Sequence, residues 1–314
     1  SDSRVWGPKT MGRIVGYVRF SLDGERLFAC SSPQQLGFDG PGWMPNFFAV
    51  LDAKSGREVF SAAEVLPGMS TNLQWSTFST DDRWLAVSQG GSVVRVLDLR
   101  DGHLVTELRG HQKDVWFLSF SADGSLLASA RADKTVRLWR LPSGEPVGRP
   151  LEHRLPVMRA ILTDDGRHLV SGSQTEGECE LQAWDVPTGR RVGEPLNGGG
   201  QMAMFVEPGA GGRFFGWMHG GKDNFTRAWY FDSFREALPT LEIAYAQCWA
   251  FSPDGKRLAI GGDDGTALVW SLESGKVLRD PIRHNRWLDS VQFSPDGQRL
   301  LTASADGNAR VWDM

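Results

Sequence analysis

The sequence has few cysteines, no long apolar run and no excess of charge of one sign, and each shortage excludes a class of protein. Its three cysteines, Cys30, Cys179 and Cys248, are widely spaced and form no CxxC pair, so neither a disulfide framework nor a zinc site is predicted. No apolar run approaches the roughly 20 residues of a membrane span, and the N-terminal segment lacks the basic-then-apolar order of a signal peptide. We therefore expect a cytoplasmic protein with reduced thiols and no membrane insertion.

The two signs of charge nearly balance, which disfavours one class of partner. The chain has 34 Lys and Arg residues against 38 Asp and Glu residues, so it offers no overall field for a polyanion. Nucleic acid is not expected as a partner. The six histidines show no i, i+4 pair, and we expect neither a metal ion nor a cofactor.

What the sequence has in abundance is one repeated turn motif. It occurs as FSLDG at 20, FSTDD at 78, FSADG at 120, LTDDG at 162, a degenerate VEPGAGG at 206, and FSPDG at 251 and 293. Such a motif suits a tight reversal, because proline presets one dihedral, aspartate bonds the nearby backbone and glycine tolerates positive φ. Short aliphatic and aromatic runs such as DVWFLSF, SLLASA and KTVRLWR separate the turns, and no stretch keeps a helical period. With a second Gly turn after the third run, each repeat is predicted to be a four-stranded meander.

The third run of each repeat ends in a similar way: VLD at 50–52, VLD at 96–98, LWR at 138–140, AWD at 183–185, AWY at 228–230, VWS at 269–271 and VWD at 311–313. Repeats with this ending resemble those of the WD-repeat (WD40) family. One meander cannot bury both of its faces, so the units must stack, and a four-stranded repeat of about 40 to 45 residues is a propeller blade. We therefore predict an all-β fold, a seven-bladed β-propeller of four-stranded antiparallel blades that forms one domain over residues 1–314.

The repeat phase also predicts how the ring closes. The blades span about 11–68, 69–110, 111–152, 153–196, 197–241, 242–283 and 284–314. The last blade is one strand short, because the sequence ends with GNARVWDM. VWGP at 5–8 matches VGRP at 147–150 and VGEP at 192–195, which we predict to be fourth strands. Residues 1–10 are therefore expected to supply the outer strand of blade seven, which leaves no bare sheet edge.

Two blades contain a histidine, a hydroxyl residue and an aspartate that could be interpreted as a hydrolytic triad. Blade three has His111, Ser129 and Asp133, followed six residues later by Trp139, and blade seven has His284, Thr302 and Asp306, followed by Trp312. The resemblance to WD repeats implies that these four residues form a buried hydrogen-bond chain. We favour that structural role, because a catalytic site would hardly occur twice around a ring.

The glycine-rich segment GWMHGGKD at 216–223 nearly matches a phosphate-binding loop. Such a loop needs a strand before it and a helix after it. No helix is predicted here, so we expect a hairpin that joins two strands.

The resemblance implies that a partner binds across one end of the ring, where the fourth-to-first and second-to-third connections lie. Three insertions fall in the second-to-third class, at 31–45, about 174–179 and about 219–224. The first contains Phe38 and Trp43, and a loop of this length either binds a partner or folds back on the ring. The other candidate partner-binding residues are Gln74, Asp114, Trp116, Met158, Met202, Tyr245, Gln247, Arg286, Trp287 and Asp289. Aromatic, Met and Arg side chains at an accessible rim are typical of a binding hot spot; packing between blades is the alternative for each.

We expect a non-catalytic, monomeric scaffold or sensor module that binds a peptide or protein on the face with the inserted loops. The repeats resemble those of bacterial WD-repeat propellers, which often follow a serine/threonine kinase or a nucleotide-binding signalling domain, so the chain is expected to be part of a larger signalling protein. The alternative is a propeller enzyme with its active site in the funnel, where Asp289 would be the titratable residue.

Overall fold

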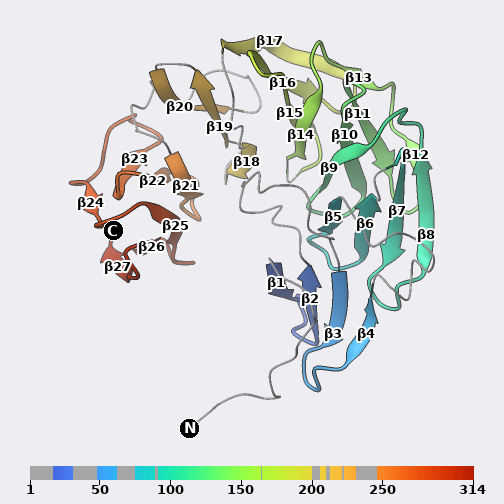
Figure 1. Ribbon diagram of the computed structural model, residues 1–314, viewed down its shortest axis with the longest axis horizontal. Helices are drawn as coiled ribbons and strands as arrows, with labels where there is room; N and C mark the ends of the chain where they lie inside the picture. Colours follow the sequence, from blue (N-terminus) through green and yellow to red (C-terminus); the bar gives the residue numbers. More distant parts are fainter. Residues whose placement is uncertain are drawn as a thin grey trace. The chain divides into compact units, whose positions relative to one another are not determined.

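The structure is a computed structural model that describes residues 17–30, 48–61, 75–88, 91–163, 165–199, 206–209, 213–220, 223–230 and 246–314. Every regular element in these ranges is a β-strand (Figure 1), which confirms the prediction of an all-β fold. These ranges contain no helix long and apolar enough to cross a membrane. The expected closing strand at 1–10 and the first insertion at 31–45 lie outside the described residues.

The described strands form seven antiparallel sheets in chain order. The first contains β1 (Tyr17–Phe20), β2 (Arg26–Cys30), β3 (Phe48–Asp52) and β4 (Glu58–Ser61), and the second contains β5 (Trp75–Phe78), β6 (Trp84–Ser88), β7 (Val93–Asp98) and β8 (Leu104–Arg109). The third contains β9 (Val115–Phe120), β10 (Leu126–Arg131), β11 (Thr135–Arg140), β12 (Glu145–Pro146) and β13 (Leu151–Glu152), and the fourth contains β14 (Val157–Leu162), β15 (His168–Gln174), β16 (Glu178–Asp185) and β17 (Arg190–Gly199). The fifth contains β18 (Val206–Gly209), β19 (Arg213–Gly220) and β20 (Asp223–Tyr230). The sixth contains β21 (Ala246–Phe251), β22 (Arg257–Gly262), β23 (Thr266–Ser271) and β24 (Ile282–Arg283), and the seventh contains β25 (Leu288–Phe293), β26 (Arg299–Ser304) and β27 (Ala309–Asp313).

The repeated turn motif builds the hairpin between the first and second strands. In the third sheet, the Ser121 hydroxyl donates to Asp123 over 2.6 Å and accepts the N–H of Leu126 over 3.0 Å. In other copies of the motif, a hydroxyl likewise donates to the aspartate two residues later; these hydroxyls belong to Ser21, Ser79, Thr163, Ser252 and Ser294. This bond lowers the pKa of the aspartate at Asp23, Asp123, Asp165, Asp254 and Asp296. The motif therefore forms its turn from hydrogen bonds within about five residues, which is why it could be recognised from the sequence.

The chain divides into two compact units, residues 1–173 with 186–189, and residues 174–185 with 190–314. In the first unit, Val94 and Val96 of the second sheet pack with Leu118, Leu127 and Trp139 of the third. In the second unit, Ala259 and Val269 of the sixth sheet pack with Val291, Phe293 and Leu300 of the seventh. Each core thus lies between the faces of neighbouring sheets, and the first strands of those sheets, β5 and β9 in one case and β21 and β25 in the other, lie side by side.

The third strands end at the predicted residues, but one predicted fourth strand is wrong. The end residues Asp52, Asp98, Arg140, Asp185, Tyr230, Ser271 and Asp313 are as expected. Residues 192–195 lie within β17, whereas 147–150 lie between β12 and β13. Gly148 takes a φ of 70° there, and Pro146 and Pro150 have no N–H to donate, so the strand is interrupted.

Two of the predicted insertions are longer hairpins and not separate loops. Around 174–179, β15 runs to Gln174 and β16 begins at Glu178, and the Thr175 N–H bonds to the Glu178 carbonyl over 2.8 Å. Around 219–224, β19 and β20 pair as far as Gly220 with Asp223, which confirms the hairpin expected in place of a phosphate-binding loop. Both insertions lengthen strand pairs.

Candidate functional site

The four residues singled out in the third sheet form a continuous chain of hydrogen bonds. His111 Nδ1 lies 3.0 Å from Asp133 Oδ2 and His111 Nε2 lies 2.8 Å from the Ser129 hydroxyl, which also accepts the Trp139 indole N–H over 2.8 Å. Burial lowers the pKa of His111, although Asp133 opposes that shift. Burial alone would raise the pKa of Asp133, but hydrogen bonds from Thr135 and His111 lower it overall. All four groups are engaged with one another, so the arrangement holds the strands together.

The seventh sheet repeats this chain, and the fourth sheet varies it. His284 lies 3.2 Å from Asp306 and 2.8 Å from Thr302, whose hydroxyl accepts the Trp312 indole N–H over 2.9 Å. The Asn285 backbone N–H lowers the pKa of Asp306. In the fourth sheet, His153 Nδ1 is 3.0 Å from the Leu151 carbonyl, so a backbone oxygen stands where the other two sheets use a carboxylate.

Three predicted partner-binding residues come together at one end of the seventh sheet, and we call them the Trp287 cluster: Arg286, Trp287 and Asp289. The Trp287 indole N–H donates to Asp289 Oδ1 over 3.1 Å, and the Arg286 guanidinium carbon lies 5.1 Å from the centre of the indole ring. All three side chains are exposed, and Trp287 is 45% accessible. Gln247 is half-buried at the corresponding position of the adjacent strand β21.

Two neighbouring turns hold the backbone of this cluster in place. The Ser304 hydroxyl donates to the Arg286 carbonyl over 3.0 Å, and the Ala305 N–H donates to the Trp287 carbonyl over 3.1 Å. On the other side, the His284 N–H donates to the Gly265 carbonyl over 2.8 Å. The exposed side chains therefore stand on a backbone that two turns fix.

A second group of predicted residues lies in the first unit, around Asp114. Trp116 and Met158 are half-buried at corresponding positions of β9 and β14. Asp114 is half-exposed, with its Oδ1 3.9 Å from Nη2 of Arg131. Arg131 was not predicted: its side chain is fully buried, its guanidinium nitrogens have no hydrogen-bond partner, and burial lowers its pKa.

A signal for Arg131 was present in the repeats. Ser173, Gly262 and Ser304 occupy the corresponding position in three other repeats, so a guanidinium there is an outlier in size and charge. The remaining predicted partner-binding residues, Phe38, Trp43, Gln74, Met202 and Tyr245, lie outside the residues whose side chains the structure describes.

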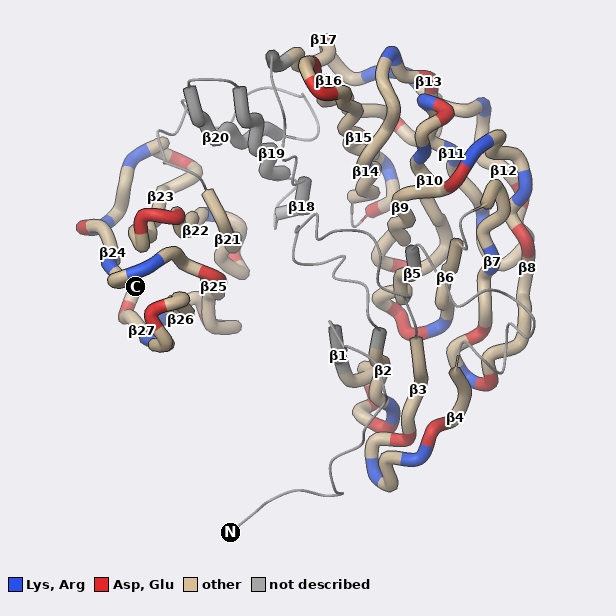
Figure 2. Tube along the Cα trace, viewed as in Figure 1, with Lys and Arg blue, Asp and Glu red and all other residues tan. Residues whose placement is uncertain are grey.

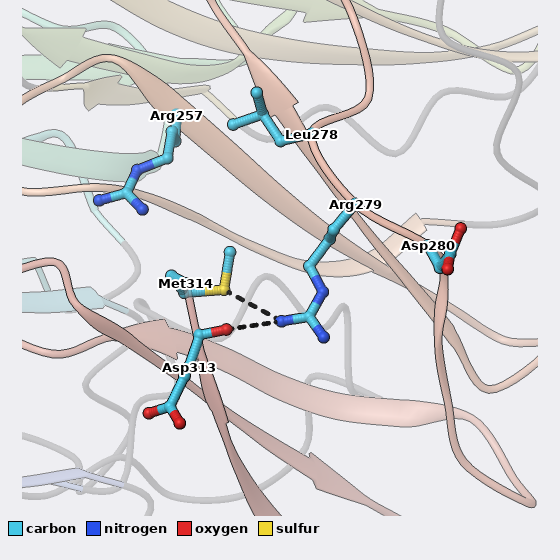
Figure 3. A pocket seen from close by; sticks show the side chains of 6 residues that line it. All are labelled: Arg257, Leu278, Arg279, Asp280, Asp313 and Met314. Atoms are coloured by element: carbon cyan, nitrogen blue, oxygen red, sulfur yellow. Dashed lines mark hydrogen bonds between the residues drawn. The ribbon is translucent and has the colours of Figure 1, made fainter.

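A cavity of about 450 Å³ lies in the second unit, and its lining contains no residue of the Trp287 cluster (Figure 3). Arg257, Leu278, Arg279, Asp280, Asp313 and Met314 line it. The Arg279 Nη1 donates to the Asp313 carbonyl over 2.8 Å, and Arg257 Nη2 donates to the Gly297 carbonyl over 2.7 Å. Its two guanidinium groups are thus already bonded to backbone oxygens.

The Cys248 thiol interacts electrostatically with Asp289. Burial raises the pKa of the Cys248 thiol to about 12, and the Asp289 carboxylate adds to this shift. A thiol with so high a pKa stays protonated at neutral pH and is a poor nucleophile. Within the described ranges, no three His, Cys, Asp or Glu residues are grouped so that they could hold a metal ion.

Comparison with known proteins finds the same repeats. The family model described as WD domain, G-beta repeat matches residues 102–140, 244–271 and 275–313. An uncharacterized WD repeat-containing protein of Synechocystis is 29% identical over 161 residues, 51% of this chain and 41% of that protein. The apoptotic protease-activating factor 1 of Rattus norvegicus is 27% identical over 199 residues, 62% of this chain and 15% of that protein. The WD repeat and HMG-box DNA-binding protein 1 of Xenopus laevis is 35% identical over 222 residues, 71% of this chain and 16% of that protein. The chain thus spans less than half the length of each of these relatives.

Proposed function

Because this chain belongs to the WD40-repeat family, we propose that it acts as a protein-interaction scaffold or sensor that binds a peptide or protein at the end carrying Trp116 and Trp287. WD40-repeat proteins generally bind other proteins and are usually not catalysts.

The observation that carries the proposal is the Trp287 cluster. Tryptophan and arginine are among the residues most enriched in the energetic centres of protein interfaces. Here the ring is held by Asp289 on one edge and by Arg286 over its face. A partner would therefore meet a surface that is ordered in advance, which lowers the entropic cost of binding.

We further propose that the sheets are the blades of a closed seven-bladed ring in which the first sheet packs against the seventh. Leu301 and Val311 pair across β26 and β27 and are 40% and 62% exposed, whereas their counterparts in the sixth sheet, Ala259 and Val269, are completely buried against the seventh. Phe20 of the first sheet is 63% exposed, whereas its counterpart Phe293 is 7% exposed in the same core. The exposed residues of the seventh and first sheets therefore correspond to the two sides of the interface that the sixth sheet forms with the seventh.

The ring is proposed to be one module of a larger protein. Residues 1–10 supply the fourth strand of the last blade, and the ring is a monomeric, cytoplasmic module of a larger bacterial signalling protein, such as a serine/threonine kinase or a signalling NTPase. Charged residues of both signs are spread over the described strands and turns (Figure 2). This distribution supports recognition by local contacts and disfavours a nucleic acid partner.

Affinity capture with the full chain from the organism that encodes it tests the function. We expect to capture partners that bind the unaltered chain and do not bind the double variant Trp116→Ala with Trp287→Ala. The same partners should still bind the control variant Leu104→Ala, which alters an exposed apolar residue of β8. Partners that bind both variants equally would contradict the proposed binding end. Turnover of a substrate by the purified chain, abolished by Asp289→Asn, would instead favour an enzyme.

A further inference from the structure

We infer that the partner presents a cationic side chain, an arginine guanidinium or a lysine ammonium, to the exposed ring of Trp287, with its charge beside Asp289. This inference rests on the proposed function and adds the chemistry that the Trp287 cluster recognises.

The first reason is the way in which the indole ring is held. Its N–H is already bonded to Asp289 Oδ1 at 3.1 Å, so the ring edge is not free to donate to a partner. What remains for a partner is the ring surface, of which a large part is accessible, and the face of an indole attracts cations more strongly than any other aromatic side chain does.

The second reason is that the cluster already contains such a contact. The Arg286 guanidinium carbon lies 5.1 Å from the centre of the Trp287 ring, which shows that the ring accepts a planar cation. An exposed contact of this kind is weak, because water competes for the cation. Arg286 can therefore be displaced, or joined from the other side of the ring, by a cation of the partner.

The third reason is the charge of the surrounding turns. The carboxylates at this end of the sixth and seventh sheets are Asp263, Asp264, Asp289 and Asp306. The turn that contains Asp263 and Asp264 packs on the backbone of the cluster, since a Cβ at Gly265 would lie 2.7 Å from the Arg286 carbonyl oxygen. Burial and then the negative charge of Asp264 raise the pKa of Asp263.

Three cations belong to the same end, Arg283, Arg286 and Arg310, and the four carboxylates outnumber them. Arg310 Nη2 lies 3.7 Å from Asp306, and Arg286 covers Trp287. An incoming cation would therefore relieve repulsion among the carboxylates, whereas an incoming anion would add to it.

Short peptides test this inference on the full chain. The probe is acetyl-Gly-Ser-Arg-Ser-Gly-amide, and the control peptide carries citrulline, a neutral analogue of nearly the same shape, in place of arginine. Binding is followed by the indole N–H resonance of Trp287, which the spectrum of Trp287→Phe identifies. We expect the citrulline peptide to bind about ten-fold more weakly, because the cation contributes about 1.4 kcal/mol.

Three variants of the chain sharpen the result. Asp289→Asn should weaken binding of the arginine peptide about three-fold or more, because the counter-charge is lost. Arg286→Ala should strengthen binding of the same peptide several-fold, because the competing guanidinium is removed. Leu104→Ala should leave the affinity unchanged.

Equal binding of the arginine and citrulline peptides, or binding of neither, would overturn the inference. If partners from affinity capture still depended on Trp287 in that case, the proposed function would stand and only the cationic chemistry would be wrong. If those partners were also indifferent to Trp116 and Trp287, the proposed function itself would fail.

Discussion

At the scale of single residues, Arg131 departs most from ordinary protein chemistry. A fully buried guanidinium without a hydrogen-bond acceptor has lost its hydration, and it has gained only the attraction of two carboxylates that do not bond to it, Asp133 and Asp114, the latter at 3.9 Å. The penalty for burying such a charge exceeds the attraction that partners without hydrogen bonds to it return.

Arg131→Met should therefore raise the stability of the protein. Methionine fills a similar volume without a charge, and we expect the free energy of unfolding to rise by roughly 1–3 kcal/mol. Urea unfolding measures the change. The matched control is Arg95→Met, since the Arg95 side chain bonds to Glu107 over 2.9 Å and its loss should reduce stability slightly. A loss in both variants would show that Arg131 has acceptors that stabilise it.

His111 should make the third sheet sensitive to acid. Burial lowers the pKa of His111 in the folded protein below its ordinary value of 6.5. At a pH between the lowered pKa and 6.5, the unfolded chain therefore binds more protons than the folded one. Stability must then fall as the pH drops through that window, and it is fully present only above about pH 6.5. In His111→Gln this contribution is absent, so the stability difference between the two proteins should shrink from pH 7.5 to pH 5.5. A difference that does not change with pH would contradict this assignment.

At the scale of secondary structure elements, the turns between second and third strands decide how the binding end is built. Gly265 and Gly307 occupy the same place in successive repeats, with φ of 79° and 82°, and Lys134 takes a φ of 66° at that place in the third sheet. A side chain is therefore tolerated there at a conformational cost of about 1 kcal/mol.

Gly265→Ala should cost more stability than Gly307→Ala. Nothing lies within 4 Å of a Cβ at Gly307, so only the cost of the dihedral applies, whereas a Cβ at Gly265 would lie 2.6 Å from the His284 carbonyl oxygen and 2.7 Å from that of Arg286. We expect roughly 1–3 kcal/mol in addition for this collision, together with a change in the Trp287 indole resonance. Thermal unfolding and NMR spectra measure the two effects, and equal losses would mean that the cluster backbone yields freely.

At the scale of the whole molecule, the exposed faces of the first and seventh sheets make the proposed closure testable. Phe20→Ala and Val311→Ala should be coupled in a double-mutant cycle by about 0.5 kcal/mol or more, because the two side chains would touch in a closed ring. Phe293→Ala with Val269→Ala is the matched control, since these residues share one core. Additive effects at Phe20 and Val311, with coupling in the control, would contradict closure.

Deletion of residues 1–10 addresses the predicted last strand. The deletion should lower the unfolding midpoint and promote concentration-dependent association, because the edge of β27 would be left bare. Sedimentation of the deleted chain at several concentrations measures the association. An unchanged midpoint with no association would show that another segment, or none, covers this edge.

Much of the architecture follows from the sequence because its causes are local. The hydroxyl-to-aspartate turns, the strand ends and the hairpin at 216–223 depend on residues a few positions apart, and so does the strand period. His111, Ser129 and Asp133 span 23 residues, yet a recurring spacing in two repeats was sufficient to group them. The interruption at Gly148 was missed, because a glycine that breaks a strand and one that continues it look alike in a single sequence.

The tertiary structure decided what depends on packing between distant parts of the chain. Arg131 is buried at the end of β10, a strand that lies against β14 of the neighbouring sheet. The backbone that carries the Trp287 cluster is fixed by turns that lie further along the chain on either side, at 265 and 304–305. The sequence by itself determined the repeats, their strands and their hydrogen-bonded histidines, since these interactions close within one meander. Burial and exposure are properties of how meanders pack face to face, and only the folded chain determines them.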